Sequence, residues 1–416
     1  MTTTTVIGYS SNRLRAWLRD DCSLMKITFI RPNMFAGRSG DAMEPLVFAI
    51  LAGLTPPEVE TVLYDERVEP VPLAEPTNLV AMTVETYTAR RSYQLASHYR
   101  RRGVPVVMGG YHPTFLPAEV LGHADAVVIG DAEGIWPQIV ADAQAGRLQR
   151  VYPQPDYPQL DGLKLDRRLF RGKRYAPAGL VQSGRGCRYA CEFCSIDAFY
   201  GSNIRQRPVS EVVAEIEALN RRHIFLVDDN IFVNEPHAAV LFQALIPLKI
   251  RWSCQVSIDI ARNDKLLALM ERSGCTTAVL GFESLDERNL SQMKKRWNLK
   301  HGDYATAVRK LRDRGIMIYG TFVFGYDEDT VDSFEASLEF ALRSRLYLAN
   351  FNPLTPMPGS QIHSRLQHEG RLIFNDWWLD PDFRYGQATF HPCRMTADQL
   401  TDGCFRTRRR FNEYRS

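Results

Sequence analysis

Three cysteines, Cys187, Cys191 and Cys194, stand at offsets of four and three residues in the run SGRGCRYACEFCSIDAFYG. At this spacing their thiolates can surround one soft inorganic centre, and no fourth cysteine lies nearby in the sequence to close a tetrahedral cage. A four-cysteine site encloses its metal, whereas three thiolates on a four-iron cluster leave one iron free for another ligand. The chain must therefore fold so that this loop reaches a site that a further ligand can enter.

Apolar runs alternate with helix-like segments from the cysteine loop to Pro358. The expected strands are residues 177–183, directly before the loop, and then 223–229, 251–258, 276–284, 316–325 and 347–356. The helix expected over residues 265–274 ends at Gly274, whose missing Cβ suits a left-handed cap. About six such strands predict a partial β/α barrel over residues 176–358, with its site at the C-terminal ends of the strands.

The same alternation precedes the barrel, over residues 25–150. The expected strands are residues 26–32, 59–65, 78–85, 104–110 and 124–131, and the expected helices are 44–54, 91–103 and 133–144. This order predicts an α/β unit with a doubly wound parallel sheet. Because ligands of such sheets bind outside the carboxyl ends of the strands, the loop residues of interest are Thr83, Glu85, Gly109, Gly110, His112 and Gly130.

The remaining segments connect or cover these two units. Residues 1–24 are expected to be an N-terminal extension, and the Pro- and Tyr-rich residues 151–175 a linker, since proline discourages regular structure. Residues 359–416 are predicted to form a small, mostly helical C-terminal cap over the barrel mouth. The aromatic residues of this cap either line a flat apolar substrate or fill a core; they are Trp377, Trp378, Phe383 and Tyr385.

Composition narrows the cellular context. The net charge of +3 gives no reason to expect nucleic acid as a partner, and no apolar run approaches the ~20 residues of a membrane span. The N-terminus lacks the apolar core of a secretion signal, so we expect a cytoplasmic protein. Eight cysteines are too few for a disulfide framework, and those outside the motif are expected to be buried small apolar residues: Cys22, Cys254, Cys275, Cys393 and Cys404.

Acidic and hydroxyl side chains stand where the barrel strands end. Asp228 and Asp229 are adjacent carboxylates that repel one another unless a cation lies beside them. Ser257, Asp259 and Glu283 follow at the ends of the next two strands, where short polar side chains can hold hydroxyl groups.

The CxxxCxxC motif after the first barrel strand resembles that of the radical S-adenosylmethionine (SAM) superfamily. The resemblance implies a [4Fe-4S] cluster on Cys187, Cys191 and Cys194, with SAM bound to the fourth iron and cleaved reductively. It implies that Phe193 packs near the adenine and that Asp229 contacts the methionine moiety, with Asp228 facing outward. It also places Ser257, Asp259 and Glu283 at the ribose. A structural zinc site is the competing interpretation.

Further motifs narrow the resemblance to the cobalamin-binding class, in its hopanoid methylase and Mg-protoporphyrin cyclase branch: MTVETYTAR, VVMGGYHPT, VDDN, GFES, FVFGYDEDT and LTPMPGS. In this class Thr83, Glu85, Gly109 and Gly110 contact the corrin and its tail, with Gly130 on the next loop. The DxHxxG signature that supplies a cobalt ligand is absent, and RPNMFAGRSG stands in its place. Many members lack the signature and still bind cobalamin, and His112 is expected to be a pocket or core residue.

The resemblance implies a cobalamin-dependent methyltransferase that acts on an unactivated carbon of a small molecule. Its electron donor would be a flavodoxin or a ferredoxin. Two alternatives remain. The same site could transfer the 3-amino-3-carboxypropyl group of SAM to a soft nucleophile or catalyse a rearrangement or cyclisation, or the chain could be a non-catalytic, metal-stabilised binding module.

Overall fold

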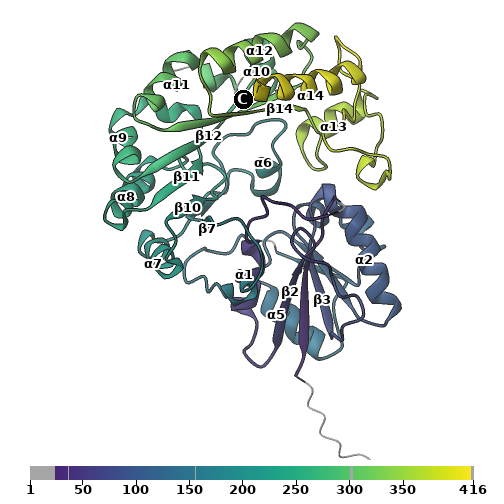
Figure 1. Cartoon of the computed structure of the whole chain (residues 1–416). Helices are drawn as coiled ribbons and strands as arrows, with labels where there is room; N and C mark the ends of the chain where they lie inside the picture. Colours follow the sequence, from purple (N-terminus) through teal and green to yellow (C-terminus); the bar gives the residue numbers. More distant parts are fainter. Residues whose placement is uncertain (1–23, 36, 155, 300–302, 414–416) are drawn as a thin grey trace, which may run out of the picture.

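Two parallel β-sheets organise the chain (Figure 1). The structure, a computed structural model, describes residues 24–35, 37–154, 156–299 and 303–413. The expected extension over residues 1–24 lies outside the described residues except for its last position.

The first sheet has six parallel strands in the order β2-β1-β3-β4-β5-β6. They are β1 (Lys26–Arg31), β2 (Glu60–Asp65), β3 (Leu79–Thr83), β4 (Val106–Gly109), β5 (Ala126–Ile129) and β6 (Val151–Pro153). Strands β1 to β5 confirm the prediction. Strand β6 corrects it, because the passage expected to be a linker begins by pairing with β5 at the sheet edge, where a terminal proline is tolerated.

Helices cover both faces of this sheet, as the doubly wound prediction requires. They are α1 (Leu46–Leu54), α2 (Ala89–Arg101), α3 (Tyr111–Phe115), α4 (Pro117–Val120) and α5 (Trp136–Gln144). On one face, Phe29 of β1 packs between Phe48 of α1 and Trp136 of α5, with ring centroids 5.3 and 5.7 Å away. On the other face, α2 contributes Tyr99 to a separate core. Burial on both faces explains why these strands are almost continuously apolar.

The second sheet confirms the predicted partial barrel. Its six strands are parallel and follow the order β14-β13-β12-β11-β10-β7. They are β7 (Gly179–Val181), β10 (His223–Leu226), β11 (Arg251–Gln255), β12 (Cys275–Glu283), β13 (Met317–Phe324) and β14 (Leu348–Pro353). The outer helices are α7 (Val209–Leu219), α8 (Glu235–Leu245), α9 (Asp264–Arg272), α10 (Glu287–Gln292), α11 (Tyr304–Arg312) and α12 (Val331–Arg343).

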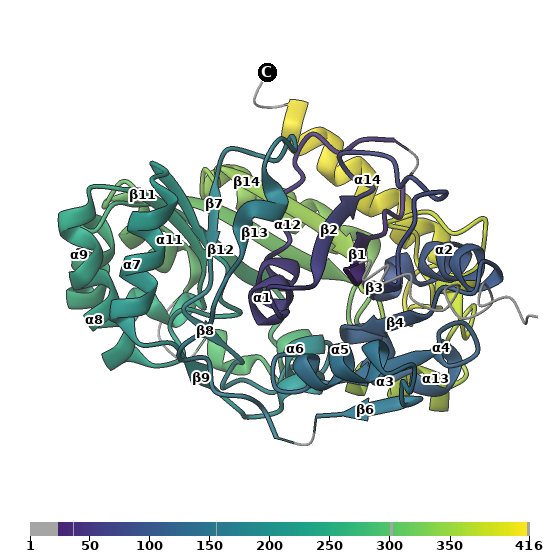
Figure 2. The same ribbon diagram turned by 90° about the horizontal axis from the view of Figure 1, so that it is seen from below.

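The second sheet curves around an inner side that its helices leave open (Figure 2). Burial alternates along β13, where every second side chain is buried against the helices and the others are half-buried or exposed. Gly274, after α9, has a φ of 92°, and a Cβ there would lie 2.2 Å from the carbonyl oxygen of Ile250. The predicted glycine cap is therefore required by a close backbone approach.

The C-terminal region is helical, as expected. It contains α13 (Gln361–His368), the short 3₁₀ helix η6 (Trp377–Leu379) and α14 (Ala397–Glu413). Helix α14 packs beside α12 and the edge strand β14, while η6 packs on α2 of the first sheet. The region therefore fastens one sheet to the other. Among the residues described, no helix is both long and apolar enough to span a membrane.

Candidate functional site

The cysteine loop, residues 186–194, joins the two-residue strand β8 (Gly184–Arg185) to helix α6 (Ser195–Tyr200). Strand β8 pairs antiparallel with β9 (Arg205–Gln206), which closes the loop at its base. Figure 1 shows α6 inside the curve of the second sheet, on the side that faces the first. Cys187, Cys191 and Cys194 are free thiols, and Cys191 is the most buried.

The donor set fits an iron–sulfur cluster. Burial raises the pKa of all three thiols, that of Cys191 to about 12, while the ammonium of Lys295 opposes the rise in each. Thiols in such surroundings become thiolates when a metal centre supplies positive charge. No three His, Cys, Asp or Glu side chains converge on a single ion within the described part of the chain. A cluster needs no such convergence, because each thiolate binds a different iron.

The end of β10 holds the start of the cysteine loop. Both carboxylate oxygens of Asp228 accept hydrogen bonds from Ser183, from its amide at 2.7 Å and from its hydroxyl. Asp228 is therefore buried, and the expectation that it faces outward is wrong. Asp229 accepts from the amide of Gly186 at 2.8 Å, and Asn230 donates to the hydroxyl of Ser257 at 3.0 Å. Burial raises the pKa of Asp228 to about 6 and also raises that of Asp229.

Asp259 anchors the middle of the loop. Its Oδ2 accepts from Arg188 Nη2 at 2.7 Å and from the Tyr189 hydroxyl at 2.5 Å. The ring of Tyr189 stacks on Trp297, with centroids 3.5 Å apart and planes 6° from parallel. The other oxygen of Asp259, Oδ1, is buried without a hydrogen-bond partner among the described residues. One acceptor of this carboxylate thus remains for a ligand.

Glu283, at the end of β12, is already paired. Its Oε1 lies 2.8 Å from the ammonium of the buried Lys295. Glu283 adopts a φ of 64° at a bulge in β12, which turns its carboxylate toward that lysine. If Glu283 contacts ribose as predicted, it must do so while its carboxylate is paired with Lys295.

Phe193 borders a small cavity of about 160 Å³ at the ends of β13 and β14. The cavity is lined by Tyr87, Phe193, Val323, Asn352, Pro353, Leu354, Thr355, Tyr385 and Gly386. Of the cap aromatics, Trp377 and Trp378 are buried against the first sheet, so these two fill a core. Tyr385 is 45% exposed and contributes to the cavity wall.

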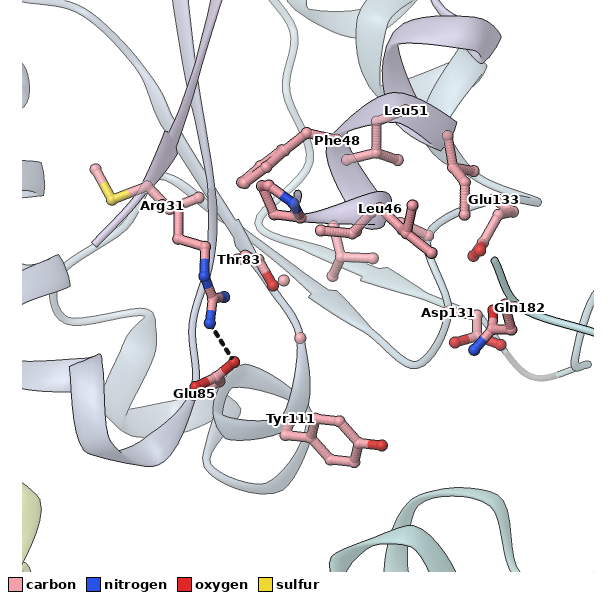
Figure 3. A pocket seen from close by; sticks show the side chains of 18 of the residues that line it. Arg31, Leu46, Phe48, Leu51, Thr83, Glu85, Tyr111, Asp131, Glu133 and Gln182 are labelled. Carbon is pink, nitrogen blue, oxygen red and sulfur yellow. Dashed lines mark hydrogen bonds and ion pairs between the residues drawn. The ribbon is translucent and has the colours of Figure 1, made fainter. Parts of the chain in front are cut away.

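A larger cavity, of about 440 Å³, lies between the two sheets (Figure 3). All five loop residues predicted for cofactor binding in the first sheet line this central cavity: Thr83, Glu85, Gly109, Gly110 and Gly130. The second sheet contributes Leu180, Gln182, Val227 and Asp229. A Cβ at Gly110 would lie 3.0 Å from the carbonyl oxygen of Val84, and its φ of 108° also requires glycine.

The walls of the central cavity differ in polarity. Helix α1 supplies an apolar wall through Leu46, Val47, Phe48, Ile50 and Leu51. The predicted site residue Glu85, on the first-sheet side, accepts a hydrogen bond from Arg31 at 2.8 Å (Figure 3). His112 is absent from the lining; it is buried and bonded to Tyr93 and Glu119, which confirms a core role.

An ion-pair network closes the central cavity toward the cysteine loop. Arg185, two residues before Cys187, lies 3.1 Å from Asp131 and 2.5 Å from Glu133, both in the loop after β5. Arg205 of β9 lies 2.8 Å from the same Asp131. We call Asp131, Glu133, Arg185 and Arg205 the intersheet ion-pair network, because it ties the cysteine loop to the first sheet.

Sequence reasoning missed the partners of the loop. Glu192, inside the motif, pairs with Arg365 of α13 at 2.8 Å, and its carbonyl oxygen accepts from the amide of Ile362. The charge of Glu192 within CxxxCxxC was a visible signal, but its partner lies 173 residues away. Cys254, Cys275 and Cys404 are buried as expected, Cys393 is exposed and corrects the expectation, and Cys22 lies outside the described residues.

Residues 181–341 match the family model of the radical SAM superfamily. The matched residues contain the cysteine loop and strands β10 to β13, so this part of the chain is a radical SAM domain. The chain is 27% identical, over 89% of its length and 83% of the relative's, to bacteriochlorophyllide d C-12(1)-methyltransferase of Chlorobaculum tepidum. It is 26% identical to the anaerobic magnesium-protoporphyrin IX monomethyl ester cyclase of Rubrivivax gelatinosus, over 93% of this chain and 77% of that one. Hopanoid C-2 methylase of Rhodopseudomonas palustris matches at 27% identity, over 66% of this chain and 54% of its own length.

Both sheets are shared with a solved structure. The radical SAM methyltransferase TsrM from Kitasatospora setae, solved with cobalamin and a [4Fe-4S] cluster bound, superposes with a TM-score of 0.66 at 18% identity. The superposition covers 83% of this chain and 75% of TsrM. The predicted resemblance to hopanoid methylase and Mg-protoporphyrin cyclase is confirmed by these relatives, and the predicted two-sheet fold is confirmed by the superposition on TsrM.

Proposed function

We propose that this chain is a cobalamin-dependent radical SAM methyltransferase that methylates an unactivated carbon of a small molecule. One observation carries the proposal: a single cavity joins the glycine-rich strand ends of the first sheet to Asp229, beside the cysteine loop. Relatives named as methyltransferases align over most of the chain, and TsrM contains both cofactors. A passive binding module has no use for this arrangement.

In this proposal Cys187, Cys191 and Cys194 hold the [4Fe-4S] cluster and leave one iron open for SAM. The cluster, when bound, supplies the electron that cleaves SAM. Asp229 would present negative charge to the amino group and sulfonium of SAM, while the hydroxyl of Ser257 and the free oxygen of Asp259 would accept from ribose hydroxyls. Phe193 would lie near the adenine, at the small cavity beside the ends of β13 and β14.

Cobalamin would occupy the central cavity. Gly109, Gly110 and Gly130 leave their backbone open to a large flat ligand, and the side chains of Thr83 and Glu85 offer hydrogen bonds at its edge. When bound, cobalamin supplies the methyl group. The apolar wall on α1 suits the face of such a ring and keeps water from it.

The chain's own aromatic residues shield the path between the two cofactor sites. Tyr111, Phe199 and Tyr200 line the central cavity on the side of α6, and the rings of Tyr111 and Phe199 pack 4.7 Å apart. We infer that these rings keep solvent out of the space between the two cofactor sites.

The deciding experiment is anaerobic. The protein is rebuilt with iron, sulfide and hydroxocobalamin, and then incubated with SAM and a low-potential reductant. We expect bound cobalamin and release of 5′-deoxyadenosine, with neither SAM cleavage nor a cluster in a Cys191→Ala control. Release of 5′-methylthioadenosine would instead support transfer of the 3-amino-3-carboxypropyl group, and one equivalent of zinc without iron would support the binding module.

A small-molecule substrate, a flavodoxin or ferredoxin as electron donor, and a cytoplasmic location complete the proposal. The substrate is sought by screening candidate small molecules with the reconstituted protein. Methylated product detected by mass spectrometry, with the label carried from methyl-labelled SAM, would identify the substrate.

A further inference from the structure

A buried ion pair stands beside the cysteine loop and has no part in the chemistry described above. The ammonium of Lys295 lies 2.8 Å from Oε1 of Glu283, and both side chains are about nine-tenths buried. Burying two charges costs free energy that their mutual attraction seldom returns in full. A pair in this position therefore calls for an explanation beyond stability.

The pair is built against the cysteine loop by its sequence neighbours. Two residues before Lys295, the carbonyl oxygen of Met293 accepts a hydrogen bond from the amide of Glu192 at 3.1 Å. Two residues after it, Trp297 stacks on Tyr189 of the same loop. The ammonium of Lys295 also lies 5.5 Å from the centre of the Trp297 ring. These contacts fix the position of Lys295 next to the cysteine loop.

The backbone of β12 is bent to admit the pair. A Cβ at Gly281 would lie 2.1 Å from Glu283 Oε1 and 2.8 Å from Lys295 Nζ, so a side chain at this position would displace the ion pair. Glu283 itself takes a left-handed φ of 64°, which a residue with a side chain seldom adopts. Strain of this kind persists where the surrounding structure imposes it, and it gathers at functional sites.

The ion pair lies close to the cluster ligands through these contacts. Glu192, which bonds to Met293, directly follows Cys191, and Tyr189, which stacks on Trp297, lies between Cys187 and Cys191. Buried charges at such short range are little screened by water. Because Lys295 and Glu283 carry opposite charges, they act with opposite signs on the electrostatic potential at the cluster ligands.

We propose that Lys295 is a positioning residue that raises the reduction potential of the cluster, and that Glu283 lowers this potential. The inference rests on the proposed function, because it requires a cluster on the three cysteines. On reduction, one electron passes from a low-potential donor to the cluster, and the donor is oxidised by one electron. No bond to the protein forms or breaks, so one negative charge is added near Lys295. A nearby positive charge favours that step and raises the potential.

The test is a redox titration of the reconstituted cluster, followed by electron paramagnetic resonance in the absence of SAM. Lys295→Gln should shift the midpoint potential to more negative values, and Glu283→Gln should shift it to less negative values. Lys294→Gln is the matched control, since it removes the same charge from an adjacent but exposed side chain, and its potential should equal that of the wild type.

Opposite shifts are the diagnostic result, because a purely structural disturbance would move both variants in the same direction. Equal potentials in all variants, or shifts of one sign, would overturn the inference. If Lys295→Gln does not fold, Lys295→Arg must keep the wild-type potential while Glu283→Gln shifts it. Failure of the proposed function looks different, since the wild-type protein itself would then show no cluster signal.

Discussion

The two sheets share parallel topology, yet their strand ends are used in opposite ways. In the first sheet Gly109 ends β4, Gly110 follows it and Gly130 follows β5, and all three border a cavity of about 440 Å³. In the second sheet Asp228 lies just after β10, Asp259 in a 3₁₀ helix after β11 and Glu283 at the end of β12. Each of these carboxylates already has a partner within the protein. One set of strand ends leaves room for a ligand, and the other is held by hydrogen bonds and an ion pair.

Under the proposed function, this difference lets one architecture serve two cofactors. A large, flat ligand needs space and backbone amides, which glycines provide. A cluster brings its own charge and needs ligands held still, which outer hydrogen bonds provide. Asp229 and Asp259, which were assigned to SAM, also accept hydrogen bonds from the cysteine loop, and Glu283 pairs with Lys295. Asp229, Ser257 and Oδ1 of Asp259 are left as candidate contacts to the nucleotide.

Replacing one cysteine of the motif should distinguish the two regions most clearly. Cys191→Ala should abolish both the cluster and SAM cleavage, because two thiolates do not hold the cubane. Hydroxocobalamin binding should persist, since the first-sheet loops are untouched. Iron content, the visible spectrum and a cobalamin titration check the two halves of this statement, and loss of cobalamin binding together with the cluster would break the comparison.

Removing an anchor of the loop should cost less. Asp259→Asn weakens the hydrogen bonds from Arg188 and Tyr189, and outer-shell changes of this kind usually lower metal affinity by about 10- to 100-fold. Cluster occupancy under limiting iron measures the effect. Asp264→Asn is the control, because this exposed aspartate pairs only with Lys310 at the surface among the ion pairs found. Equal occupancy in both variants would mean that Asp259 is not an anchor.

Filling the central cavity should affect the binding of cobalamin but not of the cluster. Gly109→Val places a side chain on the cavity wall, and we expect cobalamin affinity to fall by roughly 10-fold or more, the cost of one misplaced apolar group. The cluster signal should be unchanged. Gly40→Val, at a glycine with open space around it, is the control, and a cobalamin titration of both variants decides.

The smallest expected effect concerns pH. Because Asp228 has a folded pKa of about 6, above its unfolded value, the folded state binds more protons between about pH 4 and pH 6. The contribution of Asp228 to stability is therefore full below this window and is lost as the pH rises through 6. Urea unfolding of the wild type and Asp228→Asn at about pH 5 and pH 7 should show a wild-type advantage that shrinks at the higher pH. A constant difference would contradict this assignment.

Local patterns predicted most of the fold, and long-range contacts account for what they missed. Strands with apolar runs and the cysteine loop after β7 were predictable, because periodicity and spacing are properties of short segments. Strand β6 was not, since it ends in a proline and opens a proline-rich passage that reads as a linker. The packing of Trp378 against the first sheet, where it donates to Glu119 259 residues away, has no local signature.

In the site, too, local patterns were predictable and long-range contacts were not. The five first-sheet loop residues were predicted because they follow strands, and the structure brings them to one cavity. The inward turn of Asp228 depends on Ser183, and the pairing of Glu283 depends on a bulge that brings Lys295 behind the cysteines. Neither relation follows from strand periodicity.

The intersheet ion-pair network also resists separation of the two sheets. Parting them at Arg185 would leave buried charges without their partners, which costs free energy. A ligand of the central cavity must therefore enter and leave without displacing Arg185, the residue that precedes the cysteine loop.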